Sequence, residues 1–146
     1  MQSYWQVDRY QHTAVNTADQ KELILICYDE AIRSLQQGRE CYQRKQYEAK
    51  AKCFIRAQNL LNELLVSLNL EAGGQIAANL KRIYQFVIDQ ITQADLKRDL
   101  KLLSDLTGML SELRSAWAQV ESRPAGGDVY GQNQAQTMAA RGGIAV

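Results

Sequence analysis

The sequence predicts an all-α protein, an antiparallel up-down-up-down four-helix bundle with an N-terminal arm and a flexible C-terminal tail. Three observations lead to this fold. The only proline of the 146-residue chain is Pro124, so the strongest helix breaker is absent from residues 1–123. Apolar residues recur at alternating steps of three and four in four segments, and a period of two is sustained nowhere. The four segments have similar lengths and short links, which places consecutive helices antiparallel.

The first helix is expected from residue 17 to about residue 44. Thr17 and Gln20 have the spacing of a capping box, in which a hydroxyl and an amide satisfy early backbone N–H groups. A seam of mostly small residues follows: Ile24, Cys27, Ala31, Ser34, Gly38 and Cys41. A second apolar stripe consists of Leu25, Tyr28, Ile32 and Leu35. One apolar face suffices for a bundle helix. The surplus therefore either fills a compact core or leaves a groove or exposed stripe for a partner helix.

The other three helices are expected at residues 47–68, from residue 75, and at residues 97–121. Each carries one regular apolar seam, in order Phe54, Ala57, Leu61, Leu64 and Leu68; Ile76, Leu80, Ile83, Val87 and Ile91; Leu103, Leu106, Leu110, Leu113, Trp117 and Val120. Off-seam Ile55, Leu60, Leu65 and Val66 broaden the second helix, as Leu102 and Met109 broaden the fourth. The links are expected at residues 45–46, 69–74 and 94–96, with the Gly73-Gly74 pair permitting a tight turn.

The bundle is expected to occupy residues 17–122, between an arm of residues 1–16 and a tail of residues 123–146. The arm contains Tyr4, Trp5, Val7 and Tyr10, large side chains that usually dock on something. They either close one end of the core or act as a removable cover over a binding groove. The tail is rich in Gly, Ala and Gln and has no apolar period, which is typical of a flexible segment.

Composition argues against several classes of function. A net charge of +1 provides no general attraction to nucleic acid or to a membrane surface. The longest uncharged apolar run, residues 23–28, is far too short for membrane insertion, and no secretory signal is visible. Cys27, Cys41 and Cys53 have no metal-binding spacing and indicate reduced, packed thiols in a cytoplasmic protein.

Catalysis is not expected either. His12 is the only histidine and lies in the arm, outside any helical cluster. No Glu-x-x-His pair is present to hold a di-metal centre in a bundle. The sequence therefore predicts a binding protein without cofactor or metal, and not an enzyme.

Basic residues gather around the link between the first two helices. Residues 33–56 contain Arg33, Arg39, Arg44, Lys45, Lys50, Lys52 and Arg56 against only Glu40 and Glu48. These cations either form a solvated face or face an acidic partner surface. The second interpretation gives an alternative function, a helical-bundle adaptor or regulator that binds another folded protein through this basic end.

Three segments carry recognisable motifs. Residues 10–32 contain an early Tyr10, then NTA and ELI…CYDEAI; residues 63–84 contain EL…SLN…GGQIA…NL…IY; residues 110–117 contain L…LR…AW. In this order and spacing, the three segments resemble the FliS flagellin export chaperones. Glu30 stands where the family commonly has Gly, and Asn69 where it commonly has Asp. The C-terminal tail is not part of the family pattern.

The resemblance implies a cytoplasmic export chaperone that binds the disordered C-terminal segment of flagellin, in a 1:1 complex. It would prevent premature polymerisation and deliver the subunit to the flagellar type III secretion system. Export-gate components or a flagellar regulator are further partners that it leaves open. The residues expected at the flagellin site are Tyr10 in the arm, Leu23, Ile24, Tyr28 and Ile32 on the first helix, Leu64 and Leu68 on the second, and Asn79 and Tyr84 on the third, with Asn79 available to hydrogen-bond a partner backbone.

Overall fold

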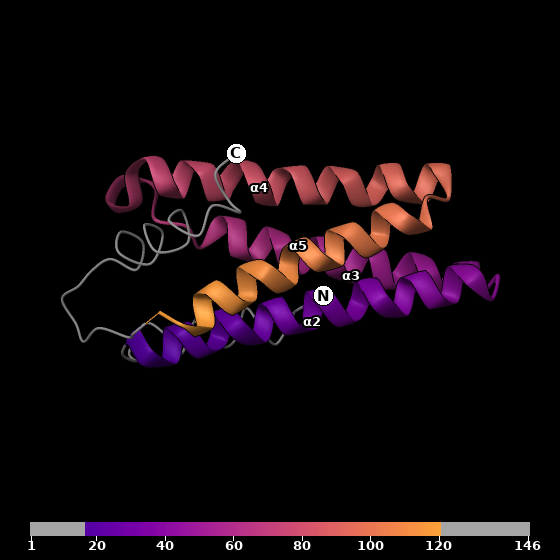
Figure 1. Ribbon diagram of the computed structural model, residues 1–146, viewed down its shortest axis with the longest axis horizontal. Coiled ribbons are helices and arrows are strands. Elements are labelled where there is room, and N and C mark those ends of the chain that lie inside the picture. Colours follow the sequence, from indigo (N-terminus) through magenta and orange to yellow (C-terminus); the bar gives the residue numbers. More distant parts are fainter. Residues whose placement is uncertain (1–16, 121–146) are drawn as a thin grey trace.

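The computed structural model describes residues 17–120, which form a four-helix bundle (Figure 1). The helices are α2 (Thr17–Gln43), α3 (Tyr47–Val66), α4 (Leu70–Lys97) and α5 (Leu100–Ala118). Consecutive helices run in opposite directions, as the colours along each ribbon show (Figure 1). No strand occurs between residues 17 and 120, so the predicted all-α bundle is confirmed over this range. The predicted arm and tail lie outside the described residues.

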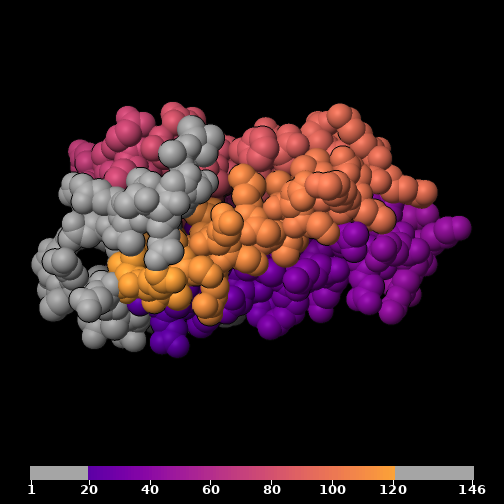
Figure 2. Space-filling view, in the orientation of Figure 1, coloured from indigo at the N-terminus to yellow at the C-terminus, as the bar shows by residue number. Residues whose placement is uncertain are grey.

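Each helix packs against two neighbours in a closed ring. α2 and α4 both contact α3 and α5, so that α2 and α4 lie diagonally across the bundle. On the face seen in Figure 2, α5 runs between α4 and α2. α2 and α3 form the closest pair, whereas α4 makes the sparsest contacts with its neighbours. None of the described helices is both long enough and apolar enough to span a lipid bilayer.

The apolar surplus of α2 is largely buried. Both stripes contribute fully covered side chains, Cys27 and Ala31 from the small seam and Tyr28 and Leu35 from the second stripe. Because α3 covers one side of α2 and α5 another, this helix needs a broader apolar face than a helix with one neighbour. Most of the surplus apolar side chains of α2 therefore fill the compact core and do not form an exposed stripe for a partner.

The small seam of α2 brings α3 close instead of leaving a groove. A Cβ atom on Gly38 would overlap the ring of Phe54 and lie 3.1 Å from Cβ of Cys53. Nearer the start of α2, the thiol of Cys27 donates to the Leu60 carbonyl at 3.3 Å. The glycine therefore provides the space that Phe54, itself only 3% exposed, fills.

The first link follows the sequence prediction, and the other two depart from it. Residues 44–46 join α2 to α3. The second link was expected at residues 69–74 but consists of residues 67–69, because residues 70–73 already form a helical turn of α4. The expected turn at the glycine pair is a kink within α4 at Gly74, whose φ of 55° and ψ of −138° suit glycine alone. Asn69 caps the helical turn of residues 70–73 by accepting from the Ala72 N–H at 3.0 Å.

The third link was wrongly placed at residues 94–96. α4 continues through this stretch because Ala94 extends its apolar seam and is fully buried. The chain turns at Arg98, which adopts a left-handed conformation with φ of 54°. Asp99 then caps α5 by accepting from the Leu102 N–H at 3.0 Å. α5 consequently begins at Leu100 rather than at residue 97.

Candidate functional site

The residues expected at the binding site divide by burial. Four lie in the core, at 5% exposure or less: Ile24, Tyr28, Leu64 and Tyr84. Leu23, Ile32 and Leu68 are half-buried and pack against that core. Tyr10 lies outside the described residues. The structure therefore brings seven of these side chains to one apolar core and its edge, and their part in binding stays a prediction.

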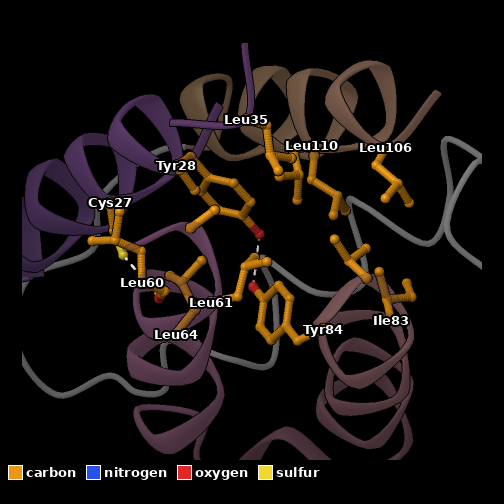
Figure 3. Packing of buried hydrophobic residues seen from close by; sticks show 14 of the residues in the cluster. Cys27, Tyr28, Leu35, Leu60, Leu61, Leu64, Ile83, Tyr84, Leu106 and Leu110 are labelled. Atoms are coloured by element: carbon orange, nitrogen blue, oxygen red, sulfur yellow. Dashed lines mark hydrogen bonds between the residues drawn. The ribbon is translucent and has the colours of Figure 1, made fainter. Parts of the chain in front are cut away.

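Tyr28 and Tyr84 meet across the diagonal of the bundle. Their hydroxyl oxygens are 2.6 Å apart, and their ring centroids are separated by 6.3 Å at a tilt of 59°. Figure 3 shows the pair among leucine side chains from α2, α3 and α5. A buried hydroxyl needs a hydrogen-bond partner, and here the hydroxyl of Tyr28 on α2 pairs with that of Tyr84 on α4. The pair thus ties the sparsely packed α4 to the diagonal helix α2.

Asn79 lies on the surface of α4, half-exposed. Its side-chain oxygen accepts from Nε2 of Gln75 at 3.0 Å and from the guanidinium of Arg82 at 2.6 Å. This oxygen is therefore engaged on its own helix. A partner backbone would have to share the oxygen with these donors or use the amide nitrogen of Asn79.

Large apolar side chains on α3 and α4 point into solvent. They are Ile55 at 56% exposure, Val66 at 66%, Leu70 at 47%, Phe86 at 48% and Leu96 at 75%. We call these five residues the exposed apolar set. Leu70, Phe86 and Leu96 were missed by the sequence reasoning. For Phe86 the available signal was its position beside the regular seam, as for Ile55 and Val66, which the sequence does single out. Leu70 and Leu96 fall in stretches expected to be links, so no helical period marked them.

A shallow hollow of about 280 Å³ lies between the first turns of α2 and the end of α5. Its walls are formed by Lys21, Glu22, Leu25, Ile26, Asp29 and Arg114. Nε and one terminal nitrogen of Arg114 donate to the two carboxylate oxygens of Asp29, at 2.8 and 3.1 Å. Lys21 donates to the carbonyls of Ala118, at 3.1 Å, and Val120. These charges tie α2 to the end of α5 and border a small apolar patch.

Most cations of the basic cluster have partners within the bundle. Glu30 pairs with both Arg33 and Arg56 at 2.9 Å. Lys50 reaches Asp95 at 2.6 Å, and its ammonium lies 4.7 Å from the centre of the Tyr42 ring. Other members pair with Glu40 (Arg44) or with the Leu100 carbonyl (Arg39). These contacts favour a solvated face, whose cations are mostly engaged within the bundle, over a surface reserved for an acidic partner.

The described residues provide little for catalysis or metal binding. Between residues 20 and 120, no three His, Cys, Asp or Glu side chains gather in a way that could hold a metal ion. Burial, reinforced by the nearby carboxylates of Glu63 and Glu30, raises the pKa of Cys27 to about 12. A thiol with this pKa stays protonated at neutral pH and is a poor nucleophile. His12 lies outside the described part of the chain.

The chain is similar to flagellar secretion chaperones over most of its length. The family model described as "Flagellar protein FliS" matches residues 2–124. The flagellar secretion chaperone FliS of Vibrio cholerae is 32% identical over 106 residues, which cover 73% of this chain and 78% of the relative. The protein of the same description from Salmonella typhimurium is 31% identical over 112 residues, with coverage of 76% and 83%. That of Bacillus subtilis is 29% identical over 110 residues, with coverage of 75% and 81%.

Proposed function

This chain belongs to the FliS family of flagellar secretion chaperones, and we propose that its cargo is the C-terminal segment of flagellin. It binds this segment in the cytosol as a 1:1 complex and acts by binding alone, without a catalytic step. Covering the segment keeps flagellin from polymerising before it reaches the type III secretion system.

The exposed apolar set carries the proposal. Five large apolar side chains are exposed on two neighbouring helices, and exposed apolar side chains that lie together commonly mark interaction sites. Ile55 and Val66 are eleven residues apart, about three helical turns, so they lie along one face of α3. A partner helix laid along this face could contact both. An amphipathic segment that is disordered when free fits this kind of surface.

In this proposal the buried residues of the expected site hold the helices in place and do not contact the cargo. Tyr28 and Tyr84 set the distance between α2 and α4, and Leu64 supports α3. Leu23, Ile32 and Leu68, which are half-buried, would meet the cargo at the edges of the core. Tyr10 would contact the cargo or cover its binding surface from the arm. Substituting the buried members would disturb the fold as well as binding, so they are unsuitable as tests of contact.

A large contact surface follows from the energetics. Ordering a disordered segment offsets about 2–5 kcal/mol of the interaction energy. Each fully covered apolar side chain contributes about 1.5–3 kcal/mol. Members of the exposed apolar set are already partly covered, at 47–75% exposure, so covering two or three of them completely contributes about 2–5 kcal/mol and only balances the ordering cost. Tight binding requires the cargo to wrap over several helix faces.

Charge placed on the exposed apolar set provides the test. Val66→Asp and Phe86→Asp change exposed side chains and leave the core intact. Ala49→Asp, about 100° or more around α3 from both Ile55 and Val66, and Ser111→Asp on α5 add the same charge at exposed positions outside the proposed contact face and serve as controls. In calorimetric titration of the full chain with a flagellin C-terminal peptide, each of the first two variants should lose at least about tenfold in affinity, or 1.4 kcal/mol. The controls should bind like the wild type.

Two results would contradict the proposal in different ways. If the peptide gives no heat with the wild-type chain, flagellin is not the cargo. If it binds and all four variants bind equally well, the cargo uses another surface. Salt separates the chaperone from the adaptor alternative, because apolar contacts tolerate salt whereas binding through the basic end of α2 and α3 would weaken steeply.

A further inference from the structure

Two of the three cysteines face each other across the α2–α3 interface. Cys41 lies near the end of α2 and Cys53 in the second turn of α3, on either side of the link formed by residues 44–46. Besides burial, which is the larger cause, the Cys41 side chain is close enough to Cys53 to raise the pKa of the Cys53 thiol. Both are half-buried, in contrast to Cys27, which is fully buried.

Close packing of the backbones explains this juxtaposition. Gly38, one turn before Cys41 on the same face of α2, allows α3 to approach until Cβ of Cys53 lies 3.1 Å from the place of a Cβ on the glycine. The antiparallel hairpin then holds the two thiols in register. Disulfides require Cβ atoms about 3.5–4.5 Å apart, and a Cβ on Gly38, one turn from Cys41 on the same face, would lie 3.1 Å from Cβ of Cys53.

We propose that Cys41 and Cys53 form a reversible disulfide that links α2 to α3 when the protein meets a low-molecular-weight disulfide. The thiolate of one cysteine attacks a sulfur of the small disulfide and displaces one small thiolate, giving a mixed disulfide. The thiolate of the second cysteine then attacks the protein sulfur of that mixed disulfide and displaces the other small thiolate. The cysteine pair loses two electrons and two protons, and the small disulfide is reduced to two thiols.

The surroundings of the pair make this reaction slow and selective. Burial, followed by the contacts with Cys41, raises the pKa of Cys53, while the nearby Arg56 acts in the opposite direction. Only thiolates attack disulfides, so closure should accelerate with rising pH. Cys27 provides an internal control, because its thiol is buried, donates to the Leu60 carbonyl and has a pKa of about 12.

The bond would restrain the unfolded chain more than the native one. Linking residues 41 and 53 closes a short loop in the unfolded state, while the two helices are already adjacent in the folded state. The midpoint of thermal unfolding should rise by about 5–10 °C, as expected for a loop of this size in a domain of this length. A thiol reductant should reverse the rise.

The experiment treats the full-length chain with oxidised glutathione, followed by intact mass measurement and tryptic mapping without reductant. Trypsin releases Cys41 in residues 40–44 and Cys53 in residues 53–56. The expected product has lost the mass of two hydrogen atoms and yields these two peptides as one linked species. Cys27→Ser should close equally well, whereas Cys41→Ser and Cys53→Ser should stop at a glutathione adduct. A wild-type chain that keeps its glutathione adducts, or a linkage that includes Cys27, would overturn the proposal.

Discussion

Replacing Gly38 by alanine should reveal how strongly the α2–α3 contact depends on a missing Cβ. An alanine inside a helix is favoured over glycine by about 0.5–1 kcal/mol. At Gly38 the new methyl group would overlap the ring of Phe54. That ring has little room to move, because it is 3% exposed and packs edge-on against the Tyr42 ring, with 6.3 Å between the ring centroids. Overpacking of this kind costs about 1–3 kcal/mol. Gly108 lies exposed on α5 with nothing within 4 Å of an added Cβ, so the same substitution there should only stabilise.

The difference between the two variants is the informative quantity, since the helix preference of alanine cancels. Gly108→Ala should exceed Gly38→Ala in the free energy of unfolding by about 1–3 kcal/mol. For a chain of this size, this corresponds to about 2–12 °C in the midpoint of thermal unfolding. Denaturant titrations followed by circular dichroism would measure both. Equal stabilisation of the two variants would refute the close α2–α3 packing.

The remaining predictions concern polar groups of the core and its border. Tyr28→Phe and Tyr84→Phe should each lower stability by about 1 kcal/mol, and the double variant should lose less than the sum, as a double-mutant cycle would show. Additive losses would mean that the two hydroxyls do not interact. The pKa of Cys27 is raised from 9.0 to about 12, so folding favours its protonated form. The raised pKa contributes fully to the free energy of unfolding below about pH 9, and this contribution disappears as the pH rises towards 12. Raising the pH from about 8 to 11 should therefore lower the free energy of unfolding of Cys27→Ala less than that of the wild type, as measured by urea titration. Equal losses would contradict the assignment. Asp29→Asn breaks the exposed ion pair with Arg114 and should lower the free energy of unfolding, measured by thermal unfolding, by less than about 1 kcal/mol. A larger loss that does not depend on salt would contradict the screening of this pair by solvent.

The sequence predicts most of the fold because each helical segment contains its own apolar period. Regular seams and the absence of proline before Pro124 were sufficient for four helices and their order. The α4–α5 link was misplaced because two nearby residues offer the same local signal for the start of the last helix. Asp99 can cap the following helix, but Asp95 offers a similar side chain one turn earlier. The burial of Ala94 decides between them, and that burial depends on neighbouring helices.

The candidate site was harder to predict, for a related reason. Periodicity shows that a face is apolar, but not which other helix covers it. Tyr28 and Leu35 form an apparent second stripe on α2, yet both are fully buried between its neighbours. Phe86 stands beside the seam of α4 and is about half exposed. The rotation of each helix within the bundle determines this difference, and rotation follows from packing contacts such as that of Gly38 with Phe54.

Circular dichroism of the full chain mixed with an equimolar flagellin C-terminal peptide tests the central claim most directly. The segment is expected to be disordered alone and helical on the bundle, so the mixture should show more helix than the sum of the separate spectra. Light scattering should give the mass of a 1:1 complex. A spectrum equal to the sum, with both components at their separate masses, would contradict the account.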